Sequence, residues 1–267
     1  MTVRPSLLLI PSVVLLCSCD KLPKLKKSSS SPGKGKSIAE EVQLSSAAKP
    51  EIVAAFEAIS LATREHNRVL LQNIGGSGPV NGPAYSAGMA TLDRSARQHS
   101  GIAKQVIDAI ATTWVYEKTL FVPFDTIRGQ MAGMPTWSKD QATQRRGYIQ
   151  IIDQQLASYD EAVSYLERVE IPLLRQNFDK HRVPREVAEE FIRLRGLHGK
   201  EGSEAELGMF REQRAALQSY REAMTAANPA QANAAVAAGD KHQQQAKQYE
   251  AKMIEEIRKQ LGSSGPL

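Results

Sequence analysis

The spacing of apolar residues is the feature of this chain that most constrains its fold. Between residues 37 and 261, apolar side chains recur every three or four positions, which places them on one face of an α-helix. The clearest stripe consists of Tyr85, Met89, Leu92, Ala96, His99, Ala103, Val106, Ile110 and Thr113. Its rhythm is close to a heptad repeat, which is typical of left-handed helix packing. The sequence shows no alternating strand pattern of useful length and therefore predicts an all-α fold.

Glycine and proline residues divide the first half of this pattern. A capping-box motif predicts a helix over residues 37–74, with a kink or split at Pro50. The glycine- and proline-rich run 75–83 ends it. A second helix is expected from Ala84 through Leu120, continuous along the near-heptad stripe and disturbed at Pro123.

The second half contains three more predicted helices. The third begins at a capping motif at Ser138 and bends at Pro172. The fourth begins at Pro184, stops in the glycine-containing run 196–202 and restarts. Asn228-Pro229 opens the last helix. Long helices joined by short turns predict an elongated antiparallel bundle of about five long, partly kinked helices.

The first 36 residues differ in composition from the rest. Leu7–Leu16 is an apolar run of about 10 residues, which suits a signal peptide and is too short to span a membrane. Residues 19–36 are rich in lysine, serine, glycine and proline, and such a segment buries too little apolar surface to fold. The predicted organisation is a signal peptide at 1–18, a flexible basic tether at 19–36, a helical bundle at 37–261 and a disordered tail at 262–267.

The net charge of the chain is concentrated at its beginning. The chain has 34 lysines and arginines, 29 aspartates and glutamates, and a formal net charge of +5. Seven of these basic residues and one acidic residue lie in the first 36 positions, so the helical part is close to neutral. Lysines in the tether would attract anionic lipid head groups. The charge distribution gives no support to nucleic-acid binding.

The segment Leu16-Cys17-Ser18-Cys19 follows the apolar run. An apolar residue three positions before a cysteine, with a small residue directly before it, resembles the processing signal of bacterial lipoproteins. The resemblance implies that the Cys19 thiol carries a diacylglyceryl group, that the chain is cut before Cys19, and that the new amino group is often acylated. Two or three acyl chains hold a protein stably on a membrane. The alternative is ordinary secretion, with cleavage before Asp20 and no lipid.

The sequence contains few patterns that indicate catalysis or metal binding. The 2 cysteines both lie in the signal region, so a chain acylated at Cys19 has no free thiol. His66 and His99 fall on the inward stripes of adjacent predicted helices and could face each other. The Glu-x-x-His pairs of bundle metal sites are missing around both. We therefore predict no catalytic residues, no cofactor and no metal site.

The segment Trp114–Trp137 allows two interpretations. It holds Trp114, Phe121, Phe124 and Trp137 together with proline and several glycines. These rings could plug the core where a helix ends, or form an exposed patch that contacts a partner or ligand.

Together these features predict a lipid-anchored, non-catalytic protein of the bacterial cell envelope, with its body outside the cytoplasm. It would act through protein–protein contacts of its helical bundle, with other envelope proteins as partners. The alternative is a lipoprotein that binds a small ligand or substrate in a pocket between helices kinked near Pro123 and Pro172. The near-heptad stripe fits self-association and an intramolecular bundle equally well.

Overall fold

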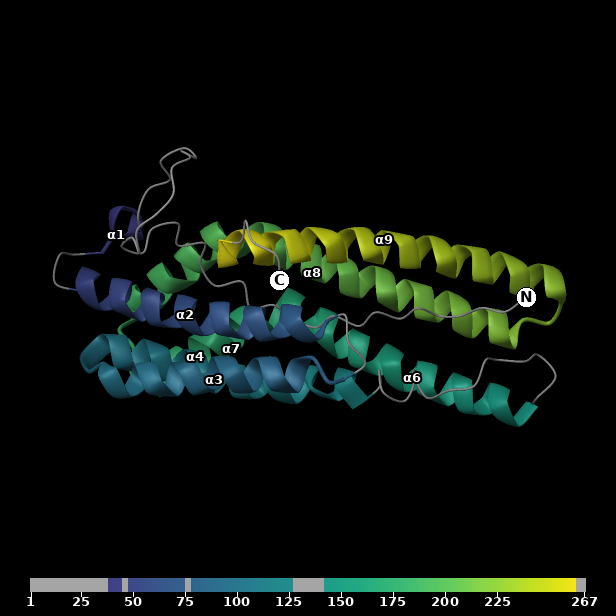
Figure 1. Cartoon of the computed structure of the whole chain (residues 1–267), viewed down its shortest axis with the longest axis horizontal. Coiled ribbons are helices and arrows are strands. Elements are labelled where there is room, and N and C mark those ends of the chain that lie inside the picture. The colour runs from purple at the N-terminus through teal and green to yellow at the C-terminus, as the bar shows by residue number, and fades with distance from the viewer. Residues whose placement is uncertain (1–37, 45–47, 75–77, 127–141, 263–267) are drawn as a thin grey trace.

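The computed structural model describes residues 38–44, 48–74, 78–126 and 142–262. The regular elements within these ranges are all helical (Figure 1). They are α1 (Ile38–Glu41), α2 (Lys49–Asn73), α3 (Asn81–Gln98), α4 (Gly101–Phe121), α6 (Ala142–Ser164), the π-helical segment η1 (Tyr165–Val169), α7 (Glu170–Lys180), α8 (Arg185–Thr225) and α9 (Pro229–Leu261). The predicted all-α fold class is therefore confirmed for the described residues.

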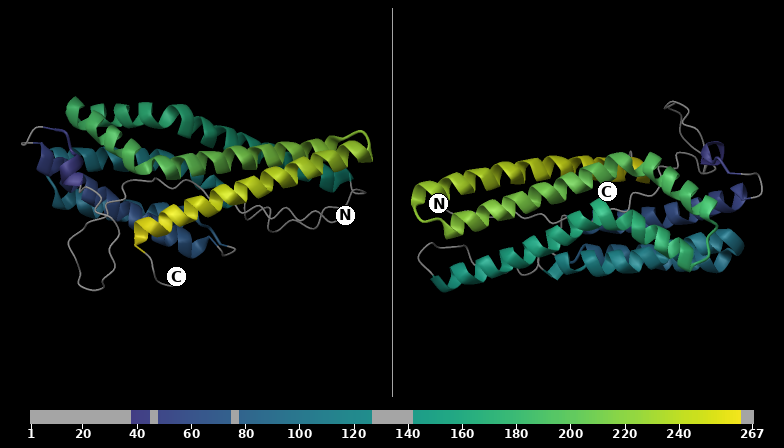
Figure 2. Two further views of the ribbon diagram at one scale, coloured as in Figure 1. Left: turned by 90° about the horizontal axis from the view of Figure 1, so that it is seen from above. Right: turned by 180° about the vertical axis from the view of Figure 1, so that it is seen from behind.

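The molecule is elongated, and most helices lie along its long axis (Figure 1). Helices α2, α3, α4 and α7 gather toward one end, where α1 also lies. Helices α8 and α9 lie side by side and continue to the opposite end, and α6 packs against α8 (Figures 1 and 2). Within the described residues, no helix is both long and apolar enough to cross a membrane.

Two helices are capped by carboxylates that are distant in the sequence. Glu51 of α2 accepts a hydrogen bond of 3.0 Å from the backbone N–H of Ala103, in the first turn of α4. Asp125 accepts three hydrogen bonds of 2.9–3.0 Å from the backbone N–H groups of residues 80–82, where α3 begins. The first N–H groups of a helix have no partner within the helix, and they favour a negative charge. These caps tie α4 to α2 and the start of α3 to the end of α4.

The expected continuous helix from Ala84 to Leu120 is wrong. Helix α3 ends at Gln98 and α4 begins at Gly101. The two residues that separate these helices, His99 and Ser100, both have an extended backbone conformation. Gly101 has a φ of 57°, a left-handed conformation that glycine adopts at little cost. The apolar stripe stays in register across this break. The periodicity of the stripe therefore does not predict the break.

The predicted interruption of the fourth helix is also wrong. The backbone of α8 is helical from Arg185 to Thr225, without a break at residues 196–202. A glycine inside a helix costs about 1 kcal/mol relative to alanine. Leu194 and Ala205, on either side of the run, are buried in the core, and this packing offsets the cost. The first turns of α8 run at an angle to the rest of the helix (Figure 1).

Two proline positions begin helices. Pro50 lies in the first turn of α2, which begins at Lys49, so the helix predicted over residues 37–74 is split into α1 and α2 and is not kinked at Pro50. Pro229 begins α9 as predicted. Before it, the Asn228 side chain caps the helix by accepting a 2.9 Å hydrogen bond from the backbone N–H of Gln231.

The third predicted helix is divided into three described elements. Its expected start at Ser138 lies outside the described residues, and α6 is described from Ala142. The bend expected at Pro172 corresponds to η1 followed by α7, which has Pro172 in its first turn. These divisions, with the break before Gly101, give more helices than the five expected.

Two helical glycines provide a matched test of packing. A methyl group at Gly88 of α3 would lie 2.4 Å from Cζ3 of Trp114 and 3.0 Å from Cβ of His66, whereas one at Gly147 of α6 would meet nothing within 4 Å. We expect Gly88→Ala to destabilise the fold by about 1–3 kcal/mol through overpacking. Gly147→Ala should instead stabilise it by about 0.5–1 kcal/mol. Urea denaturation followed by circular dichroism measures both. Equal effects of the two substitutions would contradict the close α3–α4 packing.

Candidate functional site

Three of the described aromatic residues of the segment Trp114–Trp137 lie in the core, whereas Tyr116 is 43 % exposed. Trp114, Phe121 and Phe124 are at most 1 % exposed. Phe121 and Phe124 contact the ring of Phe210 at centroid distances of 6.0 and 5.9 Å. These three side chains therefore belong to the core and do not form an exposed patch. Trp137 lies outside the described residues.

The two histidines on the predicted inward stripes occupy different surroundings. His66 is buried, and its ring packs against the rings of Tyr85 and Trp114 at 4.7 and 5.6 Å. His99 follows the end of α3, and its Nδ1 lies 2.7 Å from the carbonyl oxygen of Ser95. In the described part of the chain, no group of three or more histidine, cysteine, aspartate or glutamate side chains could hold a metal ion.

A cluster of ionisable side chains lies inside the bundle, at residues that were not expected to form a site. Glu117 comes from α4, Tyr165 from η1, Glu170 from α7 and Arg195 from α8. The Tyr165 hydroxyl donates a 2.6 Å hydrogen bond to Oε1 of Glu117. Arg195 donates to Glu170 in an ion pair whose two side chains are each 12 % exposed. We call these four residues the buried polar cluster.

The surroundings of the buried polar cluster change the acidity of its members. Burial and, to a smaller extent, the neighbouring Glu170 carboxylate together raise the pKa of Glu117 to about 8, against the opposing effects of the Tyr165 hydrogen bond and the Arg195 charge. Burial and the nearby Glu117 also raise the pKa of Tyr165, which stays protonated and acts as a donor. Glu117 is therefore mostly neutral at pH 7.

The core leaves almost no free volume at the buried polar cluster. The cavity beside it measures about 10 Å³ and is bordered by Trp114, Glu117, Glu170 and Arg195. One further hydrogen bond, of 3.0 Å, joins Asn177 to Thr113 nearby. The arrangement can bind and release a proton, but it has no room for a substrate.

Sequence reasoning missed the buried polar cluster, although one signal pointed to it. Val106, Ile110 and Thr113 define the inward stripe of α4, and Glu117 is the next position on that stripe. A carboxylate on an inward stripe indicates a buried acid. No comparable signal marks Glu170 or Arg195, because their burial depends on how α7 and α8 cross α4.

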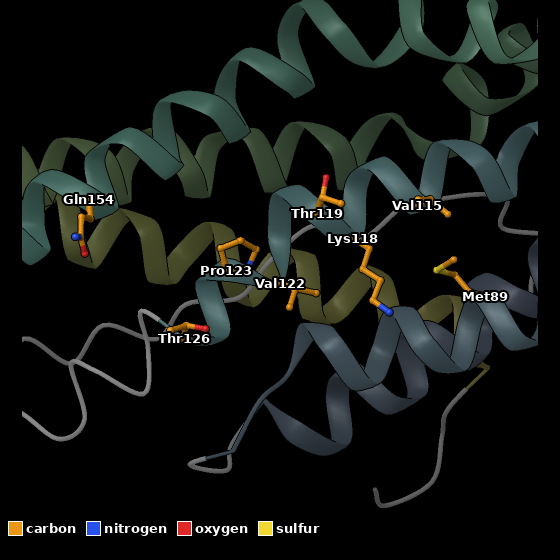
Figure 3. A pocket seen from close by; sticks show the side chains of 8 residues that line it. All are labelled: Met89, Val115, Lys118, Thr119, Val122, Pro123, Thr126 and Gln154. Atoms are coloured by element: carbon orange, nitrogen blue, oxygen red, sulfur yellow. The ribbon is translucent and has the colours of Figure 1, made fainter.

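A second feature lies on the outer side of α4. An open groove of about 710 Å³ runs along this helix toward α3 and α6 (Figure 3). It is lined by Met89, Val115, Lys118, Thr119, Val122, Pro123, Thr126 and Gln154. We call it the α4 groove. Its surface is mostly apolar, and Lys118 is the one charged side chain among its lining residues. The groove reaches Pro123, one of the two kinks where a pocket was expected.

Comparisons with known proteins supply no relative. No protein-family model, curated protein or solved structure matches the chain.

Breaking the buried Arg195–Glu170 pair should cost more stability than breaking an ion pair on the surface. Replacing Arg195 with Met leaves Glu170 without its cation in the core, so we expect a loss of about 3–5 kcal/mol of stability. Arg175→Met breaks the exposed Arg175–Glu189 pair, whose side chains are 50 % and 46 % exposed. That variant should lose less than about 1 kcal/mol. Urea unfolding at neutral pH compares the two variants, and similar losses would contradict the buried pair.

Proposed function

We propose that this chain is a lipid-anchored, non-catalytic protein of the bacterial cell envelope that acts through protein–protein contacts of an antiparallel helical bundle. The anchor is proposed from Leu16, Ser18 and Cys19, which resemble a lipoprotein processing signal. The non-catalytic role is supported by the position of the buried polar cluster, which a substrate cannot reach. The partners would be other envelope proteins.

The attachment of α1 to the bundle supports a tethered body. The backbone N–H of Gln43 donates a 2.6 Å hydrogen bond to Glu190 of α8. Arg193 of α8 donates a 2.8 Å hydrogen bond to the carbonyl oxygen of Glu41. Because the proposed tether enters the body at α1, the α8–α9 turn at the opposite end of the molecule would extend away from the membrane (Figure 1).

The α4 groove is the single observation that carries the proposed contact function. Val115, which lines the groove beside Met89 and Val122, is 51 % exposed. Large apolar side chains that gather in an open groove lose unfavourable contact with water when a partner covers them. An extended helical surface with such a groove fits a partner helix or loop.

The same groove supports a second candidate, a lipoprotein that binds a small ligand. Its volume of about 710 Å³ lies in the range typical of small-molecule sites. Lys118 at a mostly apolar surface favours an amphipathic ligand with an anionic group. The openness of the groove favours a protein partner over a small ligand, which usually needs a more enclosing site.

The anchor is tested by intact mass of the protein purified from a bacterial membrane fraction. We expect a mature N-terminus at Cys19 with added acyl mass, and loss of that mass in Cys19→Ser. Cys17→Ser is the matched control and should be lipidated as the wild type, because Cys17 lies in the removed segment. A chain cut before Asp20 without lipid would contradict the anchor.

The contact function is tested by placing a photo-crosslinking amino acid in the α4 groove of the chain in living cells. Val115 is the test position, and Leu61 of α2 is the control because it is equally exposed, at 52 % against 51 %. We expect a discrete protein adduct at Val115 that Val122→Glu abolishes, since a charge would replace an apolar contact.

Other outcomes separate the candidates. An adduct of only lipid or metabolite mass at Val115 would favour the ligand-binding alternative. Equal adducts at both positions, or none at either, would contradict the α4 groove as a contact surface.

A further inference from the structure

The buried polar cluster has an unequal number of opposite charges. It contains two carboxyl groups, Glu117 and Glu170, and one guanidinium, Arg195. The Arg195 guanidinium is hydrogen-bonded to Glu170, whereas Glu117 accepts its hydrogen bond from the neutral Tyr165 hydroxyl and not from a cation. An unpaired carboxylate is strongly disfavoured in an apolar interior, so the group takes up a proton instead.

Glu117 has one carboxyl oxygen without a hydrogen bond of normal geometry, which favours its protonated form over its ionised form. Its Oε1 accepts from the Tyr165 hydroxyl at 2.6 Å, and the Tyr85 hydroxyl also lies close to the group. Its Oε2 is buried and makes no hydrogen bond of normal geometry. An ionised carboxylate in this position would leave a charged oxygen unsatisfied, at a much higher cost than a neutral one.

The element that supplies Tyr165 is itself unusual. Residues Tyr165–Val169 form a π-helical turn between α6 and α7. Such turns are rare and often occur at functional positions of helices. Here the turn separates two α-helical segments, and it carries Tyr165 against Glu117 and leads directly into Glu170.

We propose that Glu117 is a proton-binding site through which pH controls the packing of α4 against η1, α7 and α8. Proton release from Glu117 creates an anion beside the Glu170 carboxylate, with only Arg195 to balance both. Separation of the helices, which admits water to Glu117, relieves that repulsion.

The charged and titratable groups around Glu117 come from several elements. Tyr85 faces it from α3, Tyr165 from η1, Glu170 from α7 and Arg195 from α8, where Glu206 also acts on Tyr85. The burial of Tyr85 and Tyr165 raises the pKa of both, so neither ionises in the range where Glu117 titrates. From α2, His66 borders the cluster through ring contacts with Tyr85 and Trp114.

The direction of the pH effect on stability follows from the raised pKa of Glu117. The pKa of Glu117 rises from an ordinary value of 4.5 to about 8 on folding. Its proton therefore stabilises the fold fully below about pH 4.5, and this contribution is lost as the pH rises through about 8. Over that interval the folding equilibrium constant falls by roughly tenfold per pH unit for this one group.

A second buried acid has to be separated from this effect. Burial raises the pKa of Glu250 on α9 to about 7, despite the opposing charge of Lys247. The measurement is therefore made in a Glu250→Gln background.

The experiment is infrared spectroscopy of the full chain as a function of pH. A protonated carboxyl group has a C=O stretching band well separated from that of a carboxylate. We expect such a band at pH 7, its loss as the pH rises above about 8, and its absence in Glu117→Gln. Glu161→Gln, at an exposed position on α6, should leave the band unchanged.

The effect of Glu117 ionisation on helix packing is measured in parallel by hydrogen exchange. Amide exchange in α4, η1 and α7 should accelerate between pH 7 and pH 9, beyond the intrinsic effect of base, in the chain that keeps Glu117. It should show no such excess in Glu117→Gln. No protonated-acid band at pH 7, or a band that persists in Glu117→Gln, would overturn the proton site. Equal exchange in both chains would overturn the coupling to packing.

A second variant keeps the proposal testable if Glu117→Gln does not fold. Tyr165→Phe removes only the hydroxyl that favours the ionised form of Glu117. The midpoint of the infrared band should then move to higher pH. An unchanged or lower midpoint would contradict the proposed role of Tyr165.

The biological meaning of this site rests on the proposed envelope location, where the body would experience the pH of the surroundings. The infrared and exchange measurements use purified chain and do not depend on that location. Failure of the lipid anchor and failure of the proton site are therefore distinguishable.

Discussion

The ion pair between Arg195 and Glu170 constrains how the helices of this bundle can pack. Both side chains are 12 % exposed, so a shift that separates α7 from α8 leaves two charges unpaired in the interior. Apolar contacts alone tolerate sliding and repacking of helices. The ion pair and the hydrogen bonds Tyr165–Glu117 and Asn177–Thr113 are directional, and together they fix α4, η1, α7 and α8 in one register.

Local signals predicted the fold class and several helix ends, whereas contacts between distant residues decided the rest. The Asn228-Pro229 start was predictable because cap and helix are adjacent in the sequence. The break before Gly101 was not, because its cap is Glu51, far away in the chain. The glycines of residues 196–202 predict a helix end, but the core packing of α8 outweighs their low helix propensity.

The same distinction explains how much of the site could be predicted. Glu117 was accessible to sequence reasoning because it continues the apolar stripe of α4. The aromatic segment was ambiguous, because rings at the end of a helix suit a core plug and an exposed patch equally. Burial of Trp114 was settled by Gly88 on α3, whose missing side chain leaves room for the indole ring. That relation between two helices cannot be read from either one alone.

Helix α4 connects the interior site with the surface groove. Glu117 points into the core, whereas Val115 and Lys118 of the same turn line the α4 groove. A helical turn is stiff, because its backbone hydrogen bonds hold neighbouring residues in fixed relative positions. Under the two proposals, a shift of α4 on proton release from Glu117 moves the groove-lining side chains with it. Partner contact and pH would then be coupled reciprocally, since a partner that favours one position of α4 changes the proton affinity of Glu117 by the same factor.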